Sequence, residues 1–230
     1  MNSKIMMKSD SITHVLYDMD GLLLDTENYY TIVNRNIAHL YGKAYDPSLK
    51  PKTMGLKAVD SARILIDELG LPLTPEEYLQ ARKGMLDEFF PRSEPKPGAV
   101  RLTRHLHSHN IPQAVATSTN RHHFELKTTR HKDWFKIFEC FVIGDDPEVK
   151  EGKPSPDIFL VAASKMKAQP ERCLVFEDAP SGVKAARAAG MHVIAVPDSN
   201  MAHYPFPEAD EILASLEEFD PAKWGLPPLS

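Results

Sequence analysis

Residues 12–27 read ITHVLYDMDGLLLDTE, and this stretch decides the fold. Its first part, Ile12–Tyr17, is a short apolar run typical of a buried strand. Asp18 and Asp20 follow directly, and Gly21 allows the chain to turn away behind them. Ligands of open α/β sheets bind at the carboxyl ends of the strands. The stretch therefore predicts a strand whose end carries two carboxylates at a functional site.

Four further β-rich runs predict the remaining strands, at Gln113–Ala116, Phe141–Ile143, Cys173–Phe176 and Val193–Val196. Segments with helical spacing lie between them, at Ala99–His109, Ile158–Lys167 and Gly182–Ala189. Strands that alternate with helices form a mostly parallel sheet with helices on both faces. We therefore expect an α/β fold with a doubly wound, Rossmann-like parallel sheet.

A long interval between the first two strands interrupts this alternation. Apolar residues recur there at helical spacing in Asn28–Tyr41, Ala58–Leu69 and Pro75–Phe89, and the Pro-rich segment Pro91–Gly98 leads back to the sheet. We expect residues 1–25 and 94–230 to form the core domain and residues 26–93 an inserted helical domain.

Composition and charge limit the class of protein. The 230 residues are 42% hydrophobic and carry a formal net charge of −5, which argues against a nucleic-acid-binding protein. No apolar run is long enough to span a membrane, and the first residues lack the apolar segment of a secretory signal. We expect a cytoplasmic monomer that does not bind membranes, with Cys140 and Cys173 as free thiols.

Polar residues also follow the later strands. Thr117 and Ser118 come after the second strand, Lys153 after the third, and the pair Glu177 and Asp178 after the fourth. Together with the first strand end they supply hydroxyls, an ammonium group and carboxylates. Such a set suits a divalent, oxygen-preferring cation and a phosphoryl group, with Mg²⁺ as the natural choice.

These motifs, in this order, resemble those of the haloacid-dehalogenase-type phosphohydrolases. The resemblance runs from about Ile12 to the C-terminus, and the helical insert is similar to the C1 cap domain of that family, which selects the substrate. Shorter stretches resemble pseudouridine-5′-phosphatases and glycerol-phosphate phosphatases, namely DMDGLLLDTE at 18–27, LKTTRH at 126–131, GDDPEV at 144–149 and WGLP at 224–227.

The resemblance implies roles for the two aspartates of the first strand end. Asp18 would be the nucleophile that forms an aspartyl-phosphate. Asp20 would protonate the leaving oxygen and then deprotonate the attacking water. For this role we expect Asp20 to begin protonated, with a pKa raised by the neighbouring carboxylates.

The resemblance also implies the ligands of Mg²⁺ and of phosphate. The Asp18 carboxylate, the Asp20 carbonyl and Asp178 would hold the cation, and Glu177 would bind it through water or orient its ligands. Lys153, the Thr117 hydroxyl and the Ser118 N–H group would contact the phosphate oxygens.

The implied function is a Mg²⁺-dependent phosphomonoester phosphatase of a small metabolite, with pseudouridine 5′-phosphate favoured as substrate. A glycerol-3-phosphatase or another sugar- or polyol-phosphate phosphatase is the alternative, and a β-phosphoglucomutase-type mutase is a further one. A catalytically silent binding module would lack at least one of Asp18, Asp20, Lys153 and Asp178, and all four are present. The Asp20 carboxylate also disfavours a true dehalogenase, whose reaction does not need it.

Several other residues allow two interpretations. Lys57 in the insert is either a contact to the leaving group or an exposed lysine. Lys127, Arg130 and His131 are interpreted as a surface patch rather than a phosphate contact, and Asp25 with Thr26 as caps of the next helix. We interpret His105, His107 and His109 as a solvated helix face rather than a metal site, and Trp134, Phe135 and Phe138 as core.

Overall fold

The computed structural model describes residues 11–198, 201 and 204–229. Its parallel sheet has the strand order β3-β2-β1-β4-β5-β6. The five predicted strands are confirmed, and a short edge strand, β6, was not predicted because only two residues pair. The strands are β1 (His14–Tyr17), β2 (Gln113–Ala116), β3 (Cys140–Val142), β4 (Cys173–Glu177), β5 (His192–Ala195) and β6 (Glu211–Ile212).

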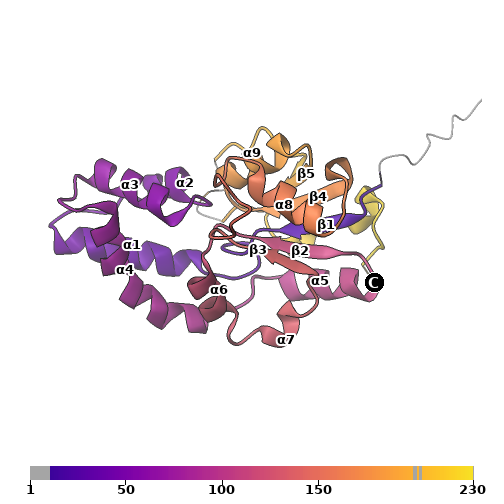
Figure 1. Ribbon diagram of the computed structural model, residues 1–230, viewed down its shortest axis with the longest axis horizontal. Helices are drawn as coiled ribbons and strands as arrows, with labels where there is room; N and C mark the ends of the chain where they lie inside the picture. Colours follow the sequence, from indigo (N-terminus) through magenta and orange to yellow (C-terminus); the bar gives the residue numbers. More distant parts are fainter. Residues whose placement is uncertain (1–10, 199–200, 202–203, 230) are drawn as a thin grey trace, which may run out of the picture.

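Helices cover both faces of this sheet (Figure 1). Neighbouring side chains of β1 point to opposite faces, so that Tyr17 packs in the apolar cluster with α5 and Leu16 in the cluster with α8 and α9. This arrangement confirms the doubly wound α/β fold. The helices are α5 (Ala99–Ser108), α6 (Arg121–Thr128), α7 (Lys132–Phe135), α8 (Asp157–Lys165) and α9 (Pro180–Ala188).

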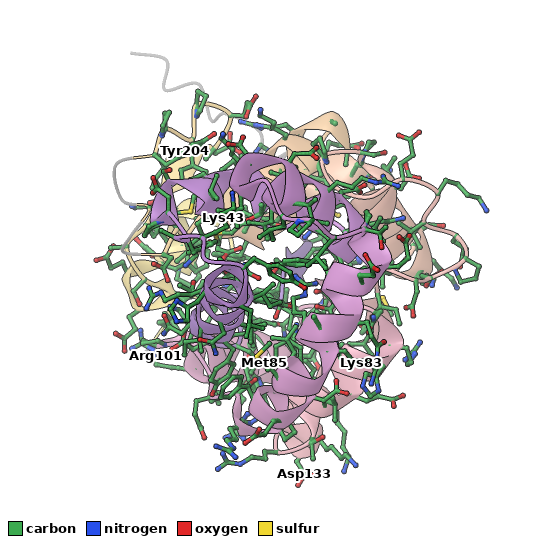
Figure 2. The ribbon with its side chains drawn as sticks, turned by 90° about the vertical axis from the view of Figure 1, so that its left-hand side faces the viewer. Lys43, Lys83, Met85, Arg101, Asp133 and Tyr204 are labelled. Atoms are coloured by element: carbon green, nitrogen blue, oxygen red, sulfur yellow. The ribbon has the colours of Figure 1, made fainter. Side chains whose placement is uncertain are left out.

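A separate group of helices, here called the cap, lies between β1 and β2 in the chain and beside the sheet in space (Figure 1). The cap has its own apolar cluster, which includes Leu65, Tyr78 and Phe90. Figure 2 looks onto the cap from outside and shows its side chains filling the space between the helices. The cap helices are α1 (Glu27–Leu40), α2 (Lys50–Thr53), α3 (Ala58–Leu69) and α4 (Pro75–Phe89).

Local signals explain where the cap helices begin and end. Thr74 and Glu77 form a reciprocal capping box at the start of α4, as the sequence Thr-Pro-Glu-Glu indicates. Gly70 ends α3 with φ of 58°, a left-handed conformation that favours glycine. Short 3₁₀ turns complete the chain at η1 (Pro47–Leu49), η2 (Phe90–Arg92), η3 (Pro170–Arg172), η5 (Leu216–Glu218) and η6 (Pro221–Trp224).

The two connections between core and cap run side by side. The Asp25 N–H donates to the Glu94 carbonyl at 2.8 Å, and the Lys96 N–H donates to the Leu23 carbonyl at 2.9 Å. The predicted domain limits, between residues 25 and 26 and between residues 93 and 94, fall on this paired segment. The division into two domains stays a prediction. Within the described ranges, no helix is long and apolar enough to cross a membrane.

Candidate active site

The candidate site lies at the carboxyl end of β1, which stands between β2 and β4 in the sheet. Asp18 follows β1, Thr117 follows β2, and Glu177 ends β4. Neighbouring parallel strands end at the same edge, so these side chains meet at the point where the strand order changes direction. The structure thus brings together the residues that the sequence placed at separate strand ends.

Lys153 is the cation at the centre of this cluster. Its ammonium nitrogen donates to Asp18 Oδ1 at 2.6 Å, to Glu177 Oε1 at 2.5 Å and to the Ala116 carbonyl at 3.2 Å. Burial lowers the pKa of Lys153, but the charges of Asp18 and Glu177 outweigh burial and raise it above its ordinary value. Lys153 therefore remains charged beside the Asp18 carboxylate.

Glu177 is fixed by donors on both of its oxygens. Oε1 accepts from Lys153, and Oε2 accepts from the backbone N–H groups of Asp178 and Ala179 at 3.1 Å each. A Cβ atom on Gly182 would lie only 1.8 Å from Glu177 Oε1, so the close approach of α9 requires glycine there. These contacts place Glu177 where it orients Lys153 and the start of α9.

The Asp178 carboxylate lacks the partners that Glu177 has. It is buried, and its Oδ2 atom accepts no hydrogen bond from any residue that the structure describes. Burial, followed by the charges of Asp18 and Glu177, raises the pKa of Asp178 well above its ordinary value. A Cβ atom on Gly21 would lie 2.0 Å from the same oxygen, so the turn after Asp20 passes directly against Asp178.

Asp18 shares this crowding of carboxylates. Burial raises its pKa to about 7, and the charges of Glu177 and Asp20 add to the effect, although Lys153 opposes it. A hard divalent cation bound between Asp18 and Asp178 would relieve the desolvation and the repulsion together. The donor chemistry and the unpartnered oxygen of Asp178 therefore fit a cation such as Mg²⁺.

The Asp20 carboxylate is held by side-chain donors, three of which lie within 2.6 Å. Oδ1 accepts from Lys127 Nζ at 2.5 Å and from Thr26 Oγ1 at 2.6 Å, and Oδ2 accepts from Thr119 Oγ1 at 2.6 Å. Burial raises the pKa of Asp20, but the charge and hydrogen bond of Lys127 and the two hydroxyls outweigh it and lower the pKa. The expected upward shift is wrong, because that expectation counted the neighbouring carboxylates and omitted Lys127.

Lys127 is the residue of the candidate site that the sequence interpretation missed. Its side chain is fully buried rather than part of a surface patch. Besides Asp20, its Nζ donates to Tyr30 Oη and to Thr119 Oγ1, both at 2.9 Å, and it lies 4.2 Å from the centre of the Phe90 ring. The helical spacing of the sequence could have predicted this burial. Lys127 lies three residues after the buried Phe124, so both side chains lie on the inner face of α6.

The other two members of that predicted patch contact the return connection of the cap. Arg130 pairs with Glu94 at 2.7 Å on the surface, and His131 Nε2 lies 2.7 Å from the Ser93 carbonyl. The three side chains therefore do not form one patch. Arg130 and His131 attach α6 and the loop after it to the segment that leads out of the cap.

Thr26 also differs from the sequence interpretation. It occupies the position before α1, but its side chain makes no capping hydrogen bond, since its hydroxyl donates to Asp20. Asp25 lies 4.0 Å from Lys96 in the paired connections and does not cap α1. The interpretation of this pair as helix caps is therefore wrong, because the Thr26 backbone has helical angles (φ −103°, ψ −16°) rather than the extended ones of most N-cap residues.

The loop after β2 faces the cap. The Thr117 hydroxyl lies 3.4 Å from Asp20 Oδ2, and the Ser118 hydroxyl donates to the Gly55 carbonyl of the cap at 2.7 Å. Ser181 of α9 likewise donates to the Met54 carbonyl at 2.8 Å. Two core hydroxyls thus hold the same corner of the cap over the carboxylates.

A cavity lies between this closed cap and the core. From the core it is lined by the strand-end residues Asp18, Asp20, Thr117, Ser118 and Thr119. From the cap it is lined mainly by polar side chains, which include Tyr30, Thr31, Asn34, Tyr45, Lys50, Ser61 and Arg82. A molecule in this cavity would meet the carboxylates at one end and hydrogen-bonding groups at the other.

Arg82 is the unusual member of the cap lining. It is 6% exposed, and its guanidinium lies 5.6 Å and 5.9 Å from the ring centres of Tyr30 and Tyr78. Among the described residues, no carboxylate pairs with it. A buried guanidinium normally has an acceptor, so Arg82 offers its donors to the cavity.

Lys57 lies at the contact between cap and core. It is half-buried, and a Cβ atom on Gly152 would lie 2.6 Å from Lys57 Cγ, so the aliphatic part of Lys57 packs on the loop just before Lys153. Lys57 is not among the residues that line the cavity. Its predicted contact with the leaving group stays a prediction.

The remaining sequence interpretations concern residues away from the cavity. His105 Nε2 lies 2.9 Å from the Pro227 carbonyl, and His109 Nδ1 lies 2.9 Å from the His105 carbonyl. These two ring nitrogens therefore contact backbone carbonyls and do not converge on a shared metal position. Trp134, Phe135 and Phe138 are buried in the core, as predicted. Cys140 and Cys173 are free thiols.

Comparison with known proteins gives consistent matches along the chain. The family model for haloacid dehalogenase-like hydrolases matches residues 12–190. The Arabidopsis thaliana protein named (DL)-glycerol-3-phosphatase 2 is 52% identical over 95% of this chain and 93% of its own length. The Drosophila melanogaster protein named Probable pseudouridine-5′-phosphatase is 43% identical over 99% of this chain and 98% of its own length.

A solved structure shows the same architecture. The crystal structure of CbbY from Rhodobacter sphaeroides in complex with phosphate superposes with a TM-score of 0.77 at 25% identity. The match covers 90% of this chain and 96% of that chain. The similarity therefore extends over both the sheet domain and the cap.

Proposed function

Because the chain belongs to the haloacid dehalogenase-like hydrolases and its relatives are phosphatases, we propose that it hydrolyses a small phosphate monoester with the help of Mg²⁺ and through an aspartyl-phosphate on Asp18. The observation that carries this proposal is that three buried groups, Asp18, Lys153 and Asp178, meet at one edge of the sheet. Asp18 is paired with Lys153 through one oxygen, and Asp178 has an oxygen without a partner.

The Asp18 and Asp178 carboxylates and the Asp20 carbonyl would hold the cation. When bound, Mg²⁺ supplies positive charge that offsets the negative charge of the phosphoryl group. Glu177 would orient Lys153 and the start of α9 instead of binding the cation directly, because both of its oxygens already accept hydrogen bonds. Lys153 adds the positive charge that lets the Asp18 carboxylate approach a phosphate dianion.

In the first half-reaction, an Asp18 oxygen forms a bond to phosphorus while the bond from phosphorus to the ester oxygen breaks. The leaving oxygen takes a proton from Asp20. For this, Asp20 must be protonated when the substrate is bound, and a phosphate dianion beside Asp20 raises its pKa. The Thr117 hydroxyl and the Ser118 N–H group would donate to phosphate oxygens.

In the second half-reaction, Asp20 accepts a proton from a water molecule that attacks phosphorus, and the bond between phosphorus and the Asp18 oxygen breaks. Lys127, Thr26 and Thr119 stabilise the carboxylate form that this step uses. The same three donors fix the orientation of Asp20, so that its carboxylate does not need to be ordered during the reaction.

We propose that residues 26–93 act as the cap that selects the alcohol part of the substrate. A polyol phosphate such as glycerol 3-phosphate suits the cap lining best, because the Arg82 guanidinium and the Asn34 amide offer donors to hydroxyl groups. Lys50 is paired with Glu27 at 3.7 Å and Ser61 donates to the Thr53 carbonyl, so these two add a polar wall to the cavity. The 52% identity to the plant glycerol-3-phosphatase supports this choice.

Pseudouridine 5′-phosphate is the second candidate substrate. The relative named for it matches the chain over almost the entire length of both proteins. The Arg82 guanidinium could also donate to the carbonyl oxygens of a uracil ring. The two candidates differ in size and in the acceptors they present, so kinetics can separate them.

Phosphate release from a panel of monoesters tests the proposal. With Mg²⁺ present, kcat/KM is measured for glycerol 3-phosphate, pseudouridine 5′-phosphate, uridine 5′-phosphate and β-glucose 1-phosphate. We expect glycerol 3-phosphate to exceed the nucleotides by at least about tenfold, equivalent to about 1.4 kcal/mol. A preference for pseudouridine 5′-phosphate would select the second candidate. Isomerisation of the sugar phosphate without phosphate release would overturn the phosphatase assignment in favour of a mutase.

A further inference from the structure

Three metal-binding side chains meet where the cap contacts the core, away from the carboxylates of the cavity. Asp87 lies on α4 of the cap, and His122 and His123 lie on α6 of the core. One potential ligand atom from each of them lies within 4.8 Å of the others. None of the three residues lines the cavity described above.

The individual distances show a partly assembled set of ligands. Asp87 Oδ1 lies 2.9 Å from His122 Nε2 and 3.4 Å from His123 Nε2. With bonds of about 2.0–2.1 Å, the ligand atoms of a tetrahedral zinc site lie roughly 3.3–3.4 Å apart. Of the three pairs, Asp87–His123 already has that separation and Asp87–His122 must open by about half an ångström. The two histidine ligand atoms lie within 4.8 Å of each other.

The His123 ring is ready to act as a ligand. Its Nε2 atom is buried and has no hydrogen-bond partner in the part of the chain that the structure describes. A buried, unpartnered ring nitrogen is costly, and a bound cation would give it a partner.

The second oxygen of Asp87 is occupied by a cap residue. Lys83 donates to Asp87 Oδ2 at 2.7 Å from one turn earlier on α4, and Figure 2 shows Lys83 on this helix. This bond leaves Oδ1 for a metal ion and fixes the direction of the carboxylate, as outer hydrogen bonds do in metal sites. The Lys83 charge lowers the affinity of the site for a cation, so we expect moderate binding.

We propose that Asp87, His122 and His123 bind a first-row transition-metal ion such as Zn²⁺, which clamps the cap to the core. The site would hold the ion with two imidazole nitrogens and one carboxylate oxygen and leave a position for water. Imidazole ligands favour Zn²⁺ over Mg²⁺, whereas the carboxylates of the cavity favour Mg²⁺. The two sites therefore differ in the metals that they select.

A clamp at this place would act on turnover. The cap covers the cavity, so product release requires the cap to move away from the core. A metal ion bonded to α4 and α6 together would stabilise the closed arrangement and slow this opening. Binding of the ion should therefore inhibit the enzyme even when Mg²⁺ is saturating.

Metal binding is tested on the full chain with Co²⁺ as the probe, in excess Mg²⁺. We expect one Co²⁺ ion with the strong visible absorption of a tetrahedral site, and an affinity at least about tenfold lower in His122→Asn and Asp87→Asn. His107→Asn, which changes an exposed histidine on α5, is the matched control and should bind as the wild type does. Asp18→Asn should also keep the site, because it changes only the cavity.

Inhibition is tested with p-nitrophenyl phosphate and Zn²⁺ at saturating Mg²⁺. We expect Zn²⁺ to inhibit the wild type and His107→Asn, with at least about a tenfold higher inhibition constant for His122→Asn. Equal Co²⁺ affinity in His122→Asn would overturn the proposal. Equal Zn²⁺ inhibition in that variant, relieved by more Mg²⁺, would also overturn the clamp, because it would place Zn²⁺ among the carboxylates.

Discussion

The core side and the cap side of the cavity differ in how their polar groups are paired. On the core side, Lys153, Asp18 and Glu177 are bonded to each other in a buried network. On the cap side, Arg82 is buried between aromatic rings without a carboxylate partner among the described residues. The core groups are held in place before a substrate binds, whereas Arg82 of the cap leaves its donors free for one. The difference supports our proposal that the core carries the chemistry and the cap selects the alcohol.

Asp18→Asn should have the largest effect, because an amide cannot form the phosphoryl-enzyme bond. We expect kcat to fall by more than about 10³-fold on every substrate, with little change in thermal unfolding, since the replacement removes one of several crowded carboxylates. Phosphate release by purified protein, with deamidation excluded by mass spectrometry, measures this. Residual activity of more than a few per cent of wild type would contradict the role of Asp18.

Removal of the metal should also abolish activity on all substrates. We expect EDTA to stop phosphate release and Mg²⁺ to restore it, whereas Ca²⁺ should inhibit because it prefers more ligands at longer distances. Titration of EDTA-treated protein with each cation, followed by an activity assay, measures this. Activity that is indifferent to chelation would rule out the site between Asp18 and Asp178.

Lys127→Met tests the residue that joins the two sides. Its loss removes a donor from Asp20 and from Tyr30 of the cap. We expect kcat to fall by about 100-fold with KM changed less than about threefold, and Lys127→Arg to recover part of the rate. A similar loss in both variants together with a lowered unfolding temperature would indicate a purely structural role.

Arg82→Met should act on one class of substrate only. The methionine keeps much of the apolar volume but removes the guanidinium donors, so we expect kcat/KM for the preferred substrate to fall by about tenfold. Acetyl phosphate, which has no polyol part, should be hydrolysed at nearly the wild-type rate. Equal losses on both would mean that Arg82 supports the folding or closure of the cap rather than substrate choice.

Lys57→Ala should have the smallest effect of the series. The Lys57 stem packs on Gly152, and Lys57 is not among the cavity-lining residues. We expect less than about a fivefold change in kcat/KM, shared by large and small substrates. A larger loss confined to the preferred substrate would show that the Lys57 ammonium reaches the alcohol when the substrate is bound.

The sequence predicted the fold and the strand-end residues better than it predicted their surroundings. Helices α3 and α4 begin and end at the predicted residues, because apolar periodicity, a capping box and Gly70 act locally. The contacts of Lys127 and Thr26 with Asp20 depend on how α6 and the insert fold back on the strand end. No local sequence pattern shows how close these side chains come to Asp20. Their roles, and the direction in which the pKa of Asp20 shifts, could therefore be inferred only from the structure.

The paired connections between core and cap have a consequence for the history of the chain. Hydrogen bonds between residues 23–25 and 94–96 keep the two ends of the insert close together. Closing a short turn in place of the whole insert would cost little chain entropy and would leave the order of the strands unchanged. One catalytic core can therefore exchange, lengthen or lose the segment between these ends and acquire a new substrate without redesign of its sheet.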